Sequence, residues 1–226
     1  FPGHRCLRGS MAVKIFKTVI LRPGYVIRNL PDWRTLRTFY NHLIVGKADR
    51  RDDTILGAVV AAVAKDGIEL IPATDFVPEI LVKDGILVGS LSRAAMADIE
   101  FGWRMAKEIG RLDIGQCVVV KGQLILAVEA IEGTDECIRR AGALCPAGGF
   151  VVVKVAKPQQ DMRFDVPTIG EGTIRTMIEA GGKVLAVEAG RTILLHEAET
   201  LALAKRHGIS VVALERPEVL NREAAA

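Results

Sequence analysis

The sequence predicts an α/β protein of two domains, with a mixed, mostly parallel sheet in the second. Hydrophobic residues make up 50% of the 226 residues but aromatic residues only 5%, so aliphatic side chains supply the core, as in helices packed on a buried sheet. In the second half of the chain, apolar strand-like runs alternate with helical runs, which is the pattern of parallel strands joined by crossover helices. This pattern begins near residue 92, where we place the domain boundary.

The first half, residues 1–92, is predicted to form a small N-terminal α/β domain. Its local patterns predict a β-rich run over 11–20, helices over 30–43 and 50–66, a strand over 68–73 and a short helix over 75–85. Asp32 is a candidate N-cap of the first helix, and Gly67 is placed to end the second in the C′ position. Residues 1–10 show no periodicity, and we expect them to be a tag or a disordered remnant.

The second half, residues 93–226, is predicted to form the C-terminal domain. It starts with a long helix over 92–113 that has one apolar stripe, formed by Ile99, Trp103, Ala106 and Ile109. We expect this helix to bridge the two halves. The remaining predicted elements are an antiparallel edge hairpin around Lys121 and Gly122, a helix over 134–141 that ends at Gly142, strands over 149–157, 183–189 and 209–215, and helices over 172–182 and 197–208.

The pentapeptide Leu-Ala-Val-Glu-Ala occurs twice, at 126–130 and at 185–189. One copy follows a hairpin and the other follows a helix, so we interpret them as two strands of one sheet and not as a duplication. Parallel strands bring their carboxyl ends to one edge of the sheet, and this is where ligands bind. We therefore expect Glu129 and Glu188 at the same edge.

The first polar cluster at this edge is the string EAIEGTD, which contains Glu129, Glu132, Gly133, Thr134 and Asp135. A glycine turn followed by a helix N-terminus favours a phosphate, and acids beside it favour a divalent cation bound to that phosphate. The alternative is that these residues only cap a short helix.

A second cluster lies in KVAKPQQDMRFDVPTIG and contains Lys154, Lys157, Gln160, Asp161, Arg163 and Asp165. Lys and Arg can neutralise a diphosphate, while an Asp can ligate Mg²⁺ or orient water; the alternative is a solvated loop with internal ion pairs. A third cluster, EAGRT, contains Glu188, Gly190, Arg191 and Thr192, and its alternative is a turn between two strand-like runs. Asp113 and Gln116 lie between a helix and a strand, where a helix-terminating turn and a ligand contact explain them equally well.

Charge is distributed unevenly along the chain. Residues 1–51 contain eleven Lys or Arg and two acids, so this segment either contacts an anionic surface or is a solvated face. Few aromatic residues are interleaved with the basic ones, which argues against a nucleic-acid partner. The longest apolar run, 55–64, is too short to cross a bilayer, so we expect only peripheral membrane contact. The four cysteines lack Cys-x-x-Cys spacing, and we expect reduced cytoplasmic thiols and no zinc site.

Four strings in the chain resemble one enzyme family: DIEFGWRMAKEIGRLDIGQCVVV, AVEAIEGTDECIRRAG, VVVKVAKPQQDMRFDVPTIG and LAVEAGRT. In this order and spacing they are similar to the Mg²⁺-dependent UDP-2,3-diacylglucosamine pyrophosphatases of lipid A biosynthesis, the type unrelated to the calcineurin-like phosphoesterases. The resemblance runs from about residue 11 to residue 215 and is most specific over 98–192. The chain departs from the family pattern in two ways: the Gly-rich start of that family has no counterpart here, and Arg191 stands where Lys is expected.

The resemblance implies Mg²⁺-assisted hydrolysis of UDP-2,3-diacylglucosamine to UMP and 2,3-diacylglucosamine 1-phosphate, with water attacking the sugar-side phosphorus. It also implies two domains with the lipid-sugar product held between them, in a cytoplasmic enzyme that contacts the inner membrane of a Gram-negative bacterium peripherally. Asp165, in the string RFDVP, matches the position expected for the essential acid of the family. A homodimer is one assembly that we consider.

The residues and the resemblance together give one hypothesis for the site. Asp165, helped by Glu129, Glu132 or Asp135, holds Mg²⁺ against the diphosphate. The rest of the predicted site binds the substrate and neutralises its charge, and consists of Gly133, Thr134, Lys154, Lys157, Gln160, Asp161, Arg163, Glu188, Gly190 and Thr192. Two alternatives stay open: a non-catalytic module that binds a nucleotide or phosphorylated metabolite, and a general nucleotide-sugar pyrophosphatase.

Overall fold

The computed structural model describes residues 60, 64, 67 and 69–215, which belong to two compact units. Residues 1–75 and 161–165 form one unit, and residues 76–160 and 166–226 form the other. The predicted elements over 11–20 and 30–43 lie outside the described residues. Val60 and Ala64 are helical and Gly67 has a φ of 77°, as expected at the end of the helix predicted over 50–66. The predicted domain boundary at residue 92 stays a prediction.

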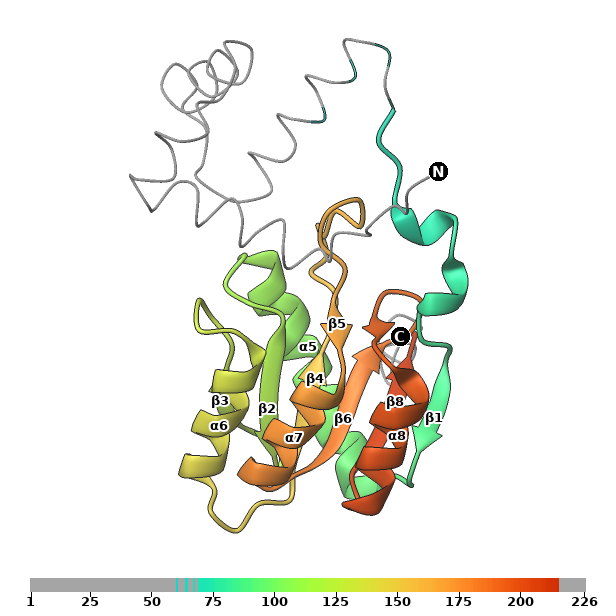
Figure 1. Ribbon diagram of the computed structural model, residues 1–226. Coiled ribbons are helices and arrows are strands. Elements are labelled where there is room, and N and C mark those ends of the chain that lie inside the picture. The colour runs from blue at the N-terminus through green and yellow to red at the C-terminus, as the bar shows by residue number, and fades with distance from the viewer. Residues whose placement is uncertain (1–59, 61–63, 65–66, 68, 216–226) are drawn as a thin grey trace, which may run out of the picture. The chain divides into compact units, whose positions relative to one another are not determined.

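The second unit is built around a six-stranded sheet of described residues, in the order β1-β8-β6-β4-β2-β3 (Figure 1). The strands are β1 Gly85–Val88, β2 Cys117–Lys121, β3 Leu124–Val128, β4 Phe150–Lys154, β6 Gly182–Glu188 and β8 Ser210–Leu214. Neighbours β4, β6 and β8 are parallel, whereas β2 is antiparallel to β3 and β4, and β1 is antiparallel to β8. Strands β3, β4, β6 and β8 therefore point the same way, which confirms the predicted mixed, mostly parallel sheet.

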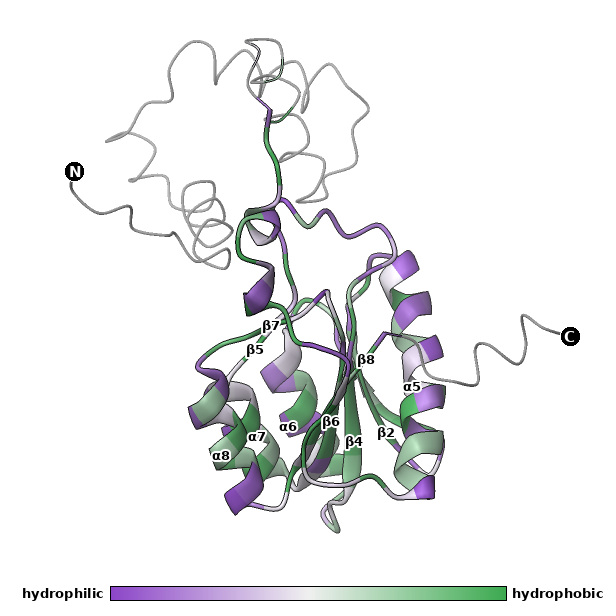
Figure 2. Cartoon of the chain, turned by 90° about the vertical axis from the view of Figure 1, so that its right-hand side faces the viewer, coloured by the Kyte–Doolittle hydropathy of each residue, from purple (hydrophilic) through white to green (hydrophobic). Residues whose placement is uncertain are grey.

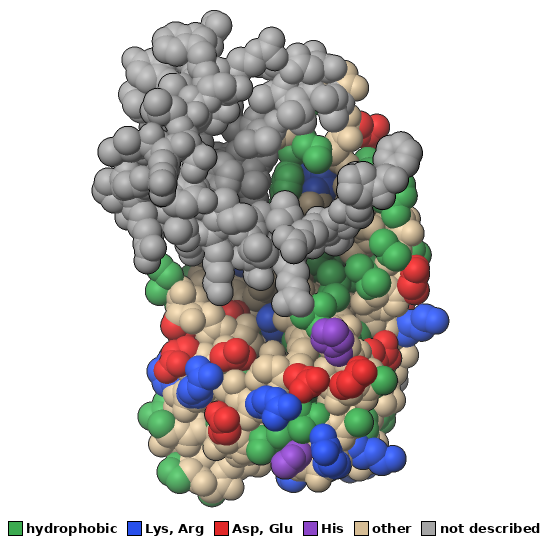
Figure 3. Space-filling view, in the orientation of Figure 1, with side chains coloured by type: hydrophobic (Ala, Val, Ile, Leu, Met, Phe, Trp, Pro, Cys, Tyr) green, Lys and Arg blue, Asp and Glu red, His purple; other side chains and the backbone are tan. Residues whose placement is uncertain are grey.

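Helices cover both faces of this sheet (Figure 2). Helix α5 (Arg93–Arg111) packs on β2 and β4 from one side. The other side carries α6 (Thr134–Leu144), α7 (Glu171–Ala180) and α8 (Glu197–Arg206), whose outer surfaces carry interspersed acidic and basic side chains (Figure 3). The short strands β5 (Thr168–Ile169) and β7 (Ile193–Leu194) form a separate parallel pair, and the 3₁₀ turns η2 (Ala73–Asp75) and η3 (Pro78–Ile80) precede β1.

The core has two layers because the central strands are buried on both faces. In β2 and β4 alternate residues join different layers: Val119 and Val152 pack on the side of α6, α7 and α8, whereas Val120 and Val153 pack against α5. A strand with two buried faces needs apolar residues at every position, which explains the runs CVVV and FVVV. Such runs alone indicate a strand covered by helices on both sides.

Helix α5 is fixed at its start and to the neighbouring hairpin by local hydrogen bonds. The Ser92 hydroxyl accepts a hydrogen bond from the backbone N–H of Ala95 at 3.1 Å, as an N-cap should. Asp98, which is buried, accepts hydrogen bonds from the backbone N–H groups of Gly122 (3.0 Å) and Gln123 (2.6 Å) in the turn between β2 and β3. The helix thus orients the edge hairpin as well as covering the sheet.

Several predicted elements are confirmed, namely the edge hairpin, the long helix, the strands β4, β6 and β8, and the helices α7 and α8. The long helix lies wholly within the second unit and packs on the sheet, while the bridging of the two halves stays a prediction. The strand predicted over 68–73 is wrong, since residues 69–72 have no regular structure and Pro72 cannot donate a ladder hydrogen bond. Strand β1 was not predicted, because three apolar residues between Gly85 and Gly89 give too little pattern.

Gly142 does not end α6, which continues to Leu144. A Cβ atom at this position would lie 2.7 Å from the carbonyl oxygen of Ala180 and 2.8 Å from its Cβ, so the glycine allows α6 to approach the end of α7 closely. Glycine occurs both at the ends of helices and where two helices pack closely together. The sequence alone does not distinguish these cases, which is why the predicted end of the helix was wrong.

Gly102 in α5 should be essential for the contact between this helix and the sheet. A Cβ atom there would lie 2.8 Å from Val153 Cγ2 and 3.0 Å from Val120 Cγ2, both in the packed interior. We expect Gly102→Ala to lower the free energy of unfolding by about 1–3 kcal/mol in urea denaturation, in spite of alanine's better helix propensity. The control is Gly172→Ala in α7, where nothing lies within 4 Å and which should stabilise the protein by up to about 1 kcal/mol. Equal effects of both changes would contradict this account.

Candidate active site

Three charged residues of the predicted polar clusters lie at one edge of the sheet. Strands β3, β4, β6 and β8 share a direction, so their carboxyl ends lie at the same edge, which we call the carboxyl edge. Glu129 follows β3, Lys154 ends β4 and Glu188 ends β6. All three side chains are buried. The prediction that the two Leu-Ala-Val-Glu-Ala copies end at a common edge is confirmed.

Glu129 is bound by two donors of its own chain. One carboxylate oxygen accepts a hydrogen bond from the backbone N–H of Gln116 at 3.0 Å, and the other accepts one from the Thr134 hydroxyl at 2.8 Å. Thr134 is the first residue of α6, and Gly133 is the N-cap. The Thr134 hydroxyl binds the Glu129 carboxylate and does not cap the helix. Gly115 is necessary here, because a Cβ atom would lie 2.1 Å from the Glu129 carbonyl oxygen.

The cysteine next to Glu129 has a suppressed acidity. A hydrogen bond with Cys137, burial, and the nearby Glu129 carboxylate raise the pKa of the Cys117 thiol well above its ordinary value. Cys117 is consequently a neutral thiol at physiological pH and packs as a small apolar side chain. Cys117, Cys137 and Cys145 are free thiols, whereas Cys6 lies outside the described residues.

The remaining residues of the first cluster lie at the start of α6. Glu132 accepts a hydrogen bond from the backbone N–H of Ala130 and forms an ion pair with Arg140. A hydrogen bond from its own backbone N–H, followed by the Arg140 guanidinium, lowers the pKa of Glu132. Gly133 has a φ of 86°, the left-handed conformation that glycine adopts readily, and Asp135 lies in the first turn of the helix.

Lys154 closes the base of the loop that carries the second cluster. This loop, residues 155–167, starts after β4 and ends before β5. The buried Lys154 ammonium donates a hydrogen bond to the Thr168 carbonyl oxygen at 2.9 Å, which ties the residue before the loop to the residue after it. Lys154 thus holds a loop together by a contact with the backbone.

Lys157 and Gln160 are fixed within the second unit. The Lys157 ammonium lies 2.5 Å from an Asp113 carboxylate oxygen, and the Lys157 backbone N–H donates to Gln160 Oε1 at 2.9 Å. Asp113 has a φ of 59° just beyond the end of α5, so a turn that ends the helix also supplies the partner of Lys157. The helix-terminating turn expected at Asp113 is confirmed, whereas a ligand contact of Asp113 stays a prediction.

Residues 161–165, the tip of the loop, belong to the first unit. Arg163 binds Asp161 through two parallel hydrogen bonds, of 2.9 Å from Nε and 2.6 Å from Nη2. This guanidinium holds the pKa of the Asp161 carboxyl below its usual range. The Asp165 backbone N–H donates to the Asp161 carbonyl oxygen at 3.1 Å, so the tip forms one helical-type turn between its first and last residues.

Both oxygens of Glu188 are bound inside the chain. The Lys107 ammonium of α5 lies 2.8 and 2.7 Å from the two oxygens, and the backbone N–H of Ala156 donates to one of them at 2.8 Å. Gly190, with a φ of 67°, donates its N–H to the Val82 carbonyl oxygen at 2.8 Å. Thr192 is fully buried, and its hydroxyl has no hydrogen-bond partner among the described residues.

Comparisons with known proteins agree with this architecture. Residues 83–212 match the family model of the LpxI C-terminal domain, and residues 4–80 match that of the LpxI N-terminal domain. A protein of Caulobacter vibrioides named UDP-2,3-diacylglucosamine pyrophosphatase LpxI is 37% identical over 198 residues, which cover 84% of this chain and 70% of that protein. The chain belongs to the LpxI family. The family resemblance predicted from four strings of residues is confirmed.

The metal site expected for this LpxI chain stays a prediction. No group of three or more His, Cys, Asp or Glu side chains within residues 69–215 is placed to hold a metal ion. Two of the predicted ligands, Glu129 and Glu132, accept hydrogen bonds from donors of the chain.

Sequence reasoning missed Lys107, which binds Glu188 at the carboxyl edge. A single lysine in a long helix is normally taken as part of a solvated face. The spacing could have indicated its position, because Lys107 follows Trp103 by four residues and therefore lies on the same side of α5 as this buried residue. The Lys107 ammonium lies 5.9 Å from the centre of the Trp103 ring, which is within the range of a cation–π interaction.

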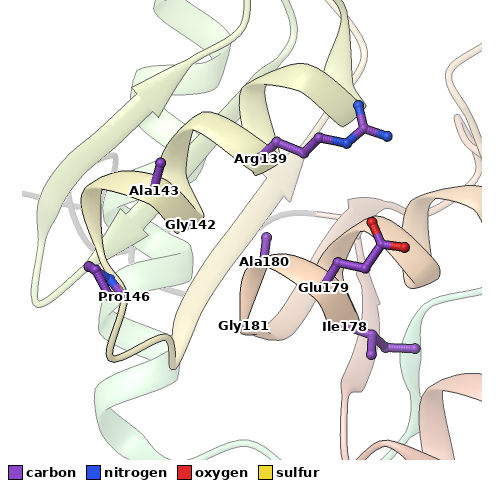
Figure 4. Close-up of a pocket in the computed structure, with 8 residues that line it drawn as sticks. All are labelled: Arg139, Gly142, Ala143, Pro146, Ile178, Glu179, Ala180 and Gly181. Atoms are coloured by element: carbon purple, nitrogen blue, oxygen red, sulfur yellow. The ribbon is translucent and has the colours of Figure 1, made fainter.

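An open hollow of about 430 Å³ lies at the opposite edge of the sheet, between the C-terminal ends of α6 and α7 (Figure 4). It is lined by Arg139, Gly142, Ala143, Pro146, Ile178, Glu179, Ala180 and Gly181. Helix C-termini present carbonyl oxygens and a negative dipole end, which disfavour an anion. This hollow is thus unsuited to a diphosphate.

Among the described residues no helix has the length and apolar character needed to span a bilayer.

The ion pair of Glu188 should contribute far more to stability than a surface pair. Glu188→Ala removes the partner of Lys107 and the acceptor of the buried Ala156 N–H. We expect a loss of about 2–3 kcal/mol in the free energy of unfolding, measured with urea at neutral pH, since Lys107 stays partly accessible to water. The matched control is Glu171→Ala, which breaks an exposed pair with Arg175 and should cost at most about 0.5 kcal/mol. A loss for Glu188→Ala no larger than that of the control would contradict this expectation.

Proposed function

We propose that this chain hydrolyses the diphosphate of UDP-2,3-diacylglucosamine and releases UMP and 2,3-diacylglucosamine 1-phosphate, a step of lipid A biosynthesis. The observation that carries the proposal is the 37% identity, over 84% of the chain, to a protein named UDP-2,3-diacylglucosamine pyrophosphatase LpxI. The enzyme is then a hydrolase that acts on a phosphoric anhydride. The polar groups gathered at the carboxyl edge support this reading, because open α/β sheets bind ligands at that edge.

Hydrolysis of a diphosphate requires charge neutralisation and a positioned water molecule. We assign the neutralising role to Lys157 and Arg163, whose positive groups are carried by the 155–167 loop. In this proposal the diphosphate takes the place of their present partners, Asp113 and Asp161. Lys154 lies in the same string, but its ammonium is bound to the Thr168 carbonyl oxygen, so its contribution is to the shape of the loop. In this proposal water attacks the sugar-side phosphorus, and UMP leaves with the bridging oxygen.

Asp165 is the acid to which we assign the central role. It stands in the string RFDVP, at the position where the family resemblance expects the essential acid. We propose that Asp165 holds Mg²⁺ together with oxygens of the diphosphate, with Asp135 or Glu129 as a further carboxylate. When bound, Mg²⁺ polarises the phosphoryl oxygens and offsets their negative charge. In this role Asp165 also orients the attacking water.

We propose peripheral contact with the cytoplasmic surface of the inner membrane. The support is the substrate, which carries two acyl chains, and the excess of nine positive charges in residues 1–51, which would be attracted to anionic lipid. A homodimer stays a prediction.

Product analysis tests the proposed reaction directly. With UDP-2,3-diacylglucosamine and Mg²⁺ we expect phosphorus NMR to detect UMP and 2,3-diacylglucosamine 1-phosphate in equal amounts. Excess EDTA should abolish the activity, and added Mg²⁺ should restore it. UDP-N-acetylglucosamine serves as the second substrate. Equal turnover of this non-acylated substrate would favour a general nucleotide-sugar pyrophosphatase, and absence of UMP from both would leave only a binding role.

Substitution of Asp165 tests its assigned role. We expect Asp165→Ala to reduce kcat at least a hundredfold while the protein stays folded, because the proposed metal ligand is lost. The control is Glu179→Ala, which removes an exposed acid at the other edge of the sheet and should leave kcat unchanged. An Asp165→Ala enzyme that hydrolyses the substrate as fast as the parent would exclude Asp165 from the reaction.

A further inference from the structure

We propose that Lys107 and Glu188 are positioning residues that fix the 155–167 loop for the reaction by clamping the peptide groups of Ala156. The inference rests on the proposed function in one respect, namely that Asp165, which this loop carries, takes part in the reaction. The residue pair joins the last turns of α5 to the end of β6, two elements that are far apart in the sequence. Neither residue then needs to touch the substrate.

The clamp acts on both polar groups of the Ala156 backbone. The N–H of Ala156 donates to a Glu188 oxygen at 2.8 Å, and the carbonyl oxygen of Ala156 accepts from the Lys107 ammonium at 2.9 Å. Lys107 and Glu188 bind each other at 2.7 Å, so the two side chains and the peptide groups form a closed ring of hydrogen bonds. Ala156 is fully buried, and its backbone position is therefore set by this ring.

The next residues of the loop are attached to the end of the same helix. Gln159 Nε2 donates to the Gly110 carbonyl oxygen at 2.7 Å, and Asp113 pairs with Lys157. A Cβ atom at Gly110 would lie 3.2 Å from both Lys157 Cα and Pro158 Cδ, so the helix backbone packs directly on the loop. Contacts of α5 thus hold four consecutive residues, 156–159, that lead to the loop tip.

Helix α5 is a rigid support for these contacts. Trp103, Ile99 and Ala106 are all buried, with at most 2% of their surface exposed, and pack on the sheet. Side chains mounted on a packed helix hold a geometry better than side chains mounted on a loop. Small errors in the position of a reacting group can reduce a rate by orders of magnitude. The clamp is therefore expected to affect the catalytic step.

The pair itself is poorly suited to bind the diphosphate. Glu188 is 7% exposed and uses both of its oxygens within the chain, and a carboxylate would repel a phosphate. Lys107 and Glu188 carry opposite charges at contact distance, so their joint field on a substrate is small. Loss of the clamp should consequently lower kcat and leave KM largely unaltered.

The central experiment compares Lys107→Met with Arg111→Met in the full chain. Each variant removes a cation of α5 that pairs with a glutamate. Lys107 pairs with the buried Glu188, whereas Arg111 pairs with Glu108 in an exposed pair on the helix itself. We expect Lys107→Met to reduce kcat for UDP-2,3-diacylglucosamine at least tenfold with KM within threefold of the parent, whereas Arg111→Met keeps parent values. Hydrogen exchange should accelerate at the amides of 156–160 in Lys107→Met and stay at the parent rate in the core of β4. Lys107→Arg, which retains a cation that can donate, should recover most of the loss.

Two further arms make the outcome decisive. Gln159→Ala removes only an exposed side chain and its hydrogen bond to Gly110, so it will fold even if Lys107→Met does not, and it should reduce kcat about threefold and accelerate the same amide exchange. The clamp would be overturned if the variant that folds, Lys107→Met or Gln159→Ala, had the kcat and the amide exchange rates of the parent. It would also be overturned if Arg111→Met lost as much kcat as Lys107→Met. If the parent itself does not hydrolyse the substrate, the proposed function fails, and the exchange at 156–160 alone decides whether the clamp exists.

Discussion

The central strands of the sheet must be covered on both faces, and much of the architecture follows from that requirement. One face is shared by three helices of ten or eleven residues, whereas the other is covered by α5, which has 19 residues. A helix of this length runs along the sheet and projects its last turns beyond the strand ends. Its C-terminal residues therefore reach the carboxyl edge, where they support the loop after β4. Core packing and organisation of the site are in this way two results of the same helix.

Local pattern was sufficient to predict most of the second unit. Continuous Val-rich runs identified the buried strands, and repeated helix signals between them identified the crossover helices. The two pentapeptides with a glutamate at the fourth position correctly placed Glu129 and Glu188 at one edge, because strand direction follows from the alternation of strand and helix. What failed depends on contacts between distant residues. Gly142 is explained by Ala180, and the irregular 69–72 segment by a proline that outweighs its aliphatic neighbours.

The candidate site shows the same division between residue type and partner. The sequence indicated that acids and cations would collect at the strand ends, and they do. It could not indicate that Glu188 faces Lys107, that Lys154 binds a backbone carbonyl, or that Thr134 binds Glu129, since each pair is formed by the fold. Charged residues in one string thus separate into those that shape the loop and those proposed to meet the substrate. The string gives their chemistry, and only the geometry gives their partners.

The position of β1 has a consequence for how the chain is assembled during synthesis. This strand is at the edge of the sheet and its neighbour is β8, which begins more than 120 residues later. A ribosome releases the chain from its N-terminus, so β1 emerges early and has no strand to pair with until nearly the whole second unit has been made. The hairpin of β2 and β3, by contrast, can form as soon as it emerges. If the strands pair in their order of synthesis, the sheet would grow from β2 and β3 towards β8, and β8 would complete it by pairing with both β6 and β1.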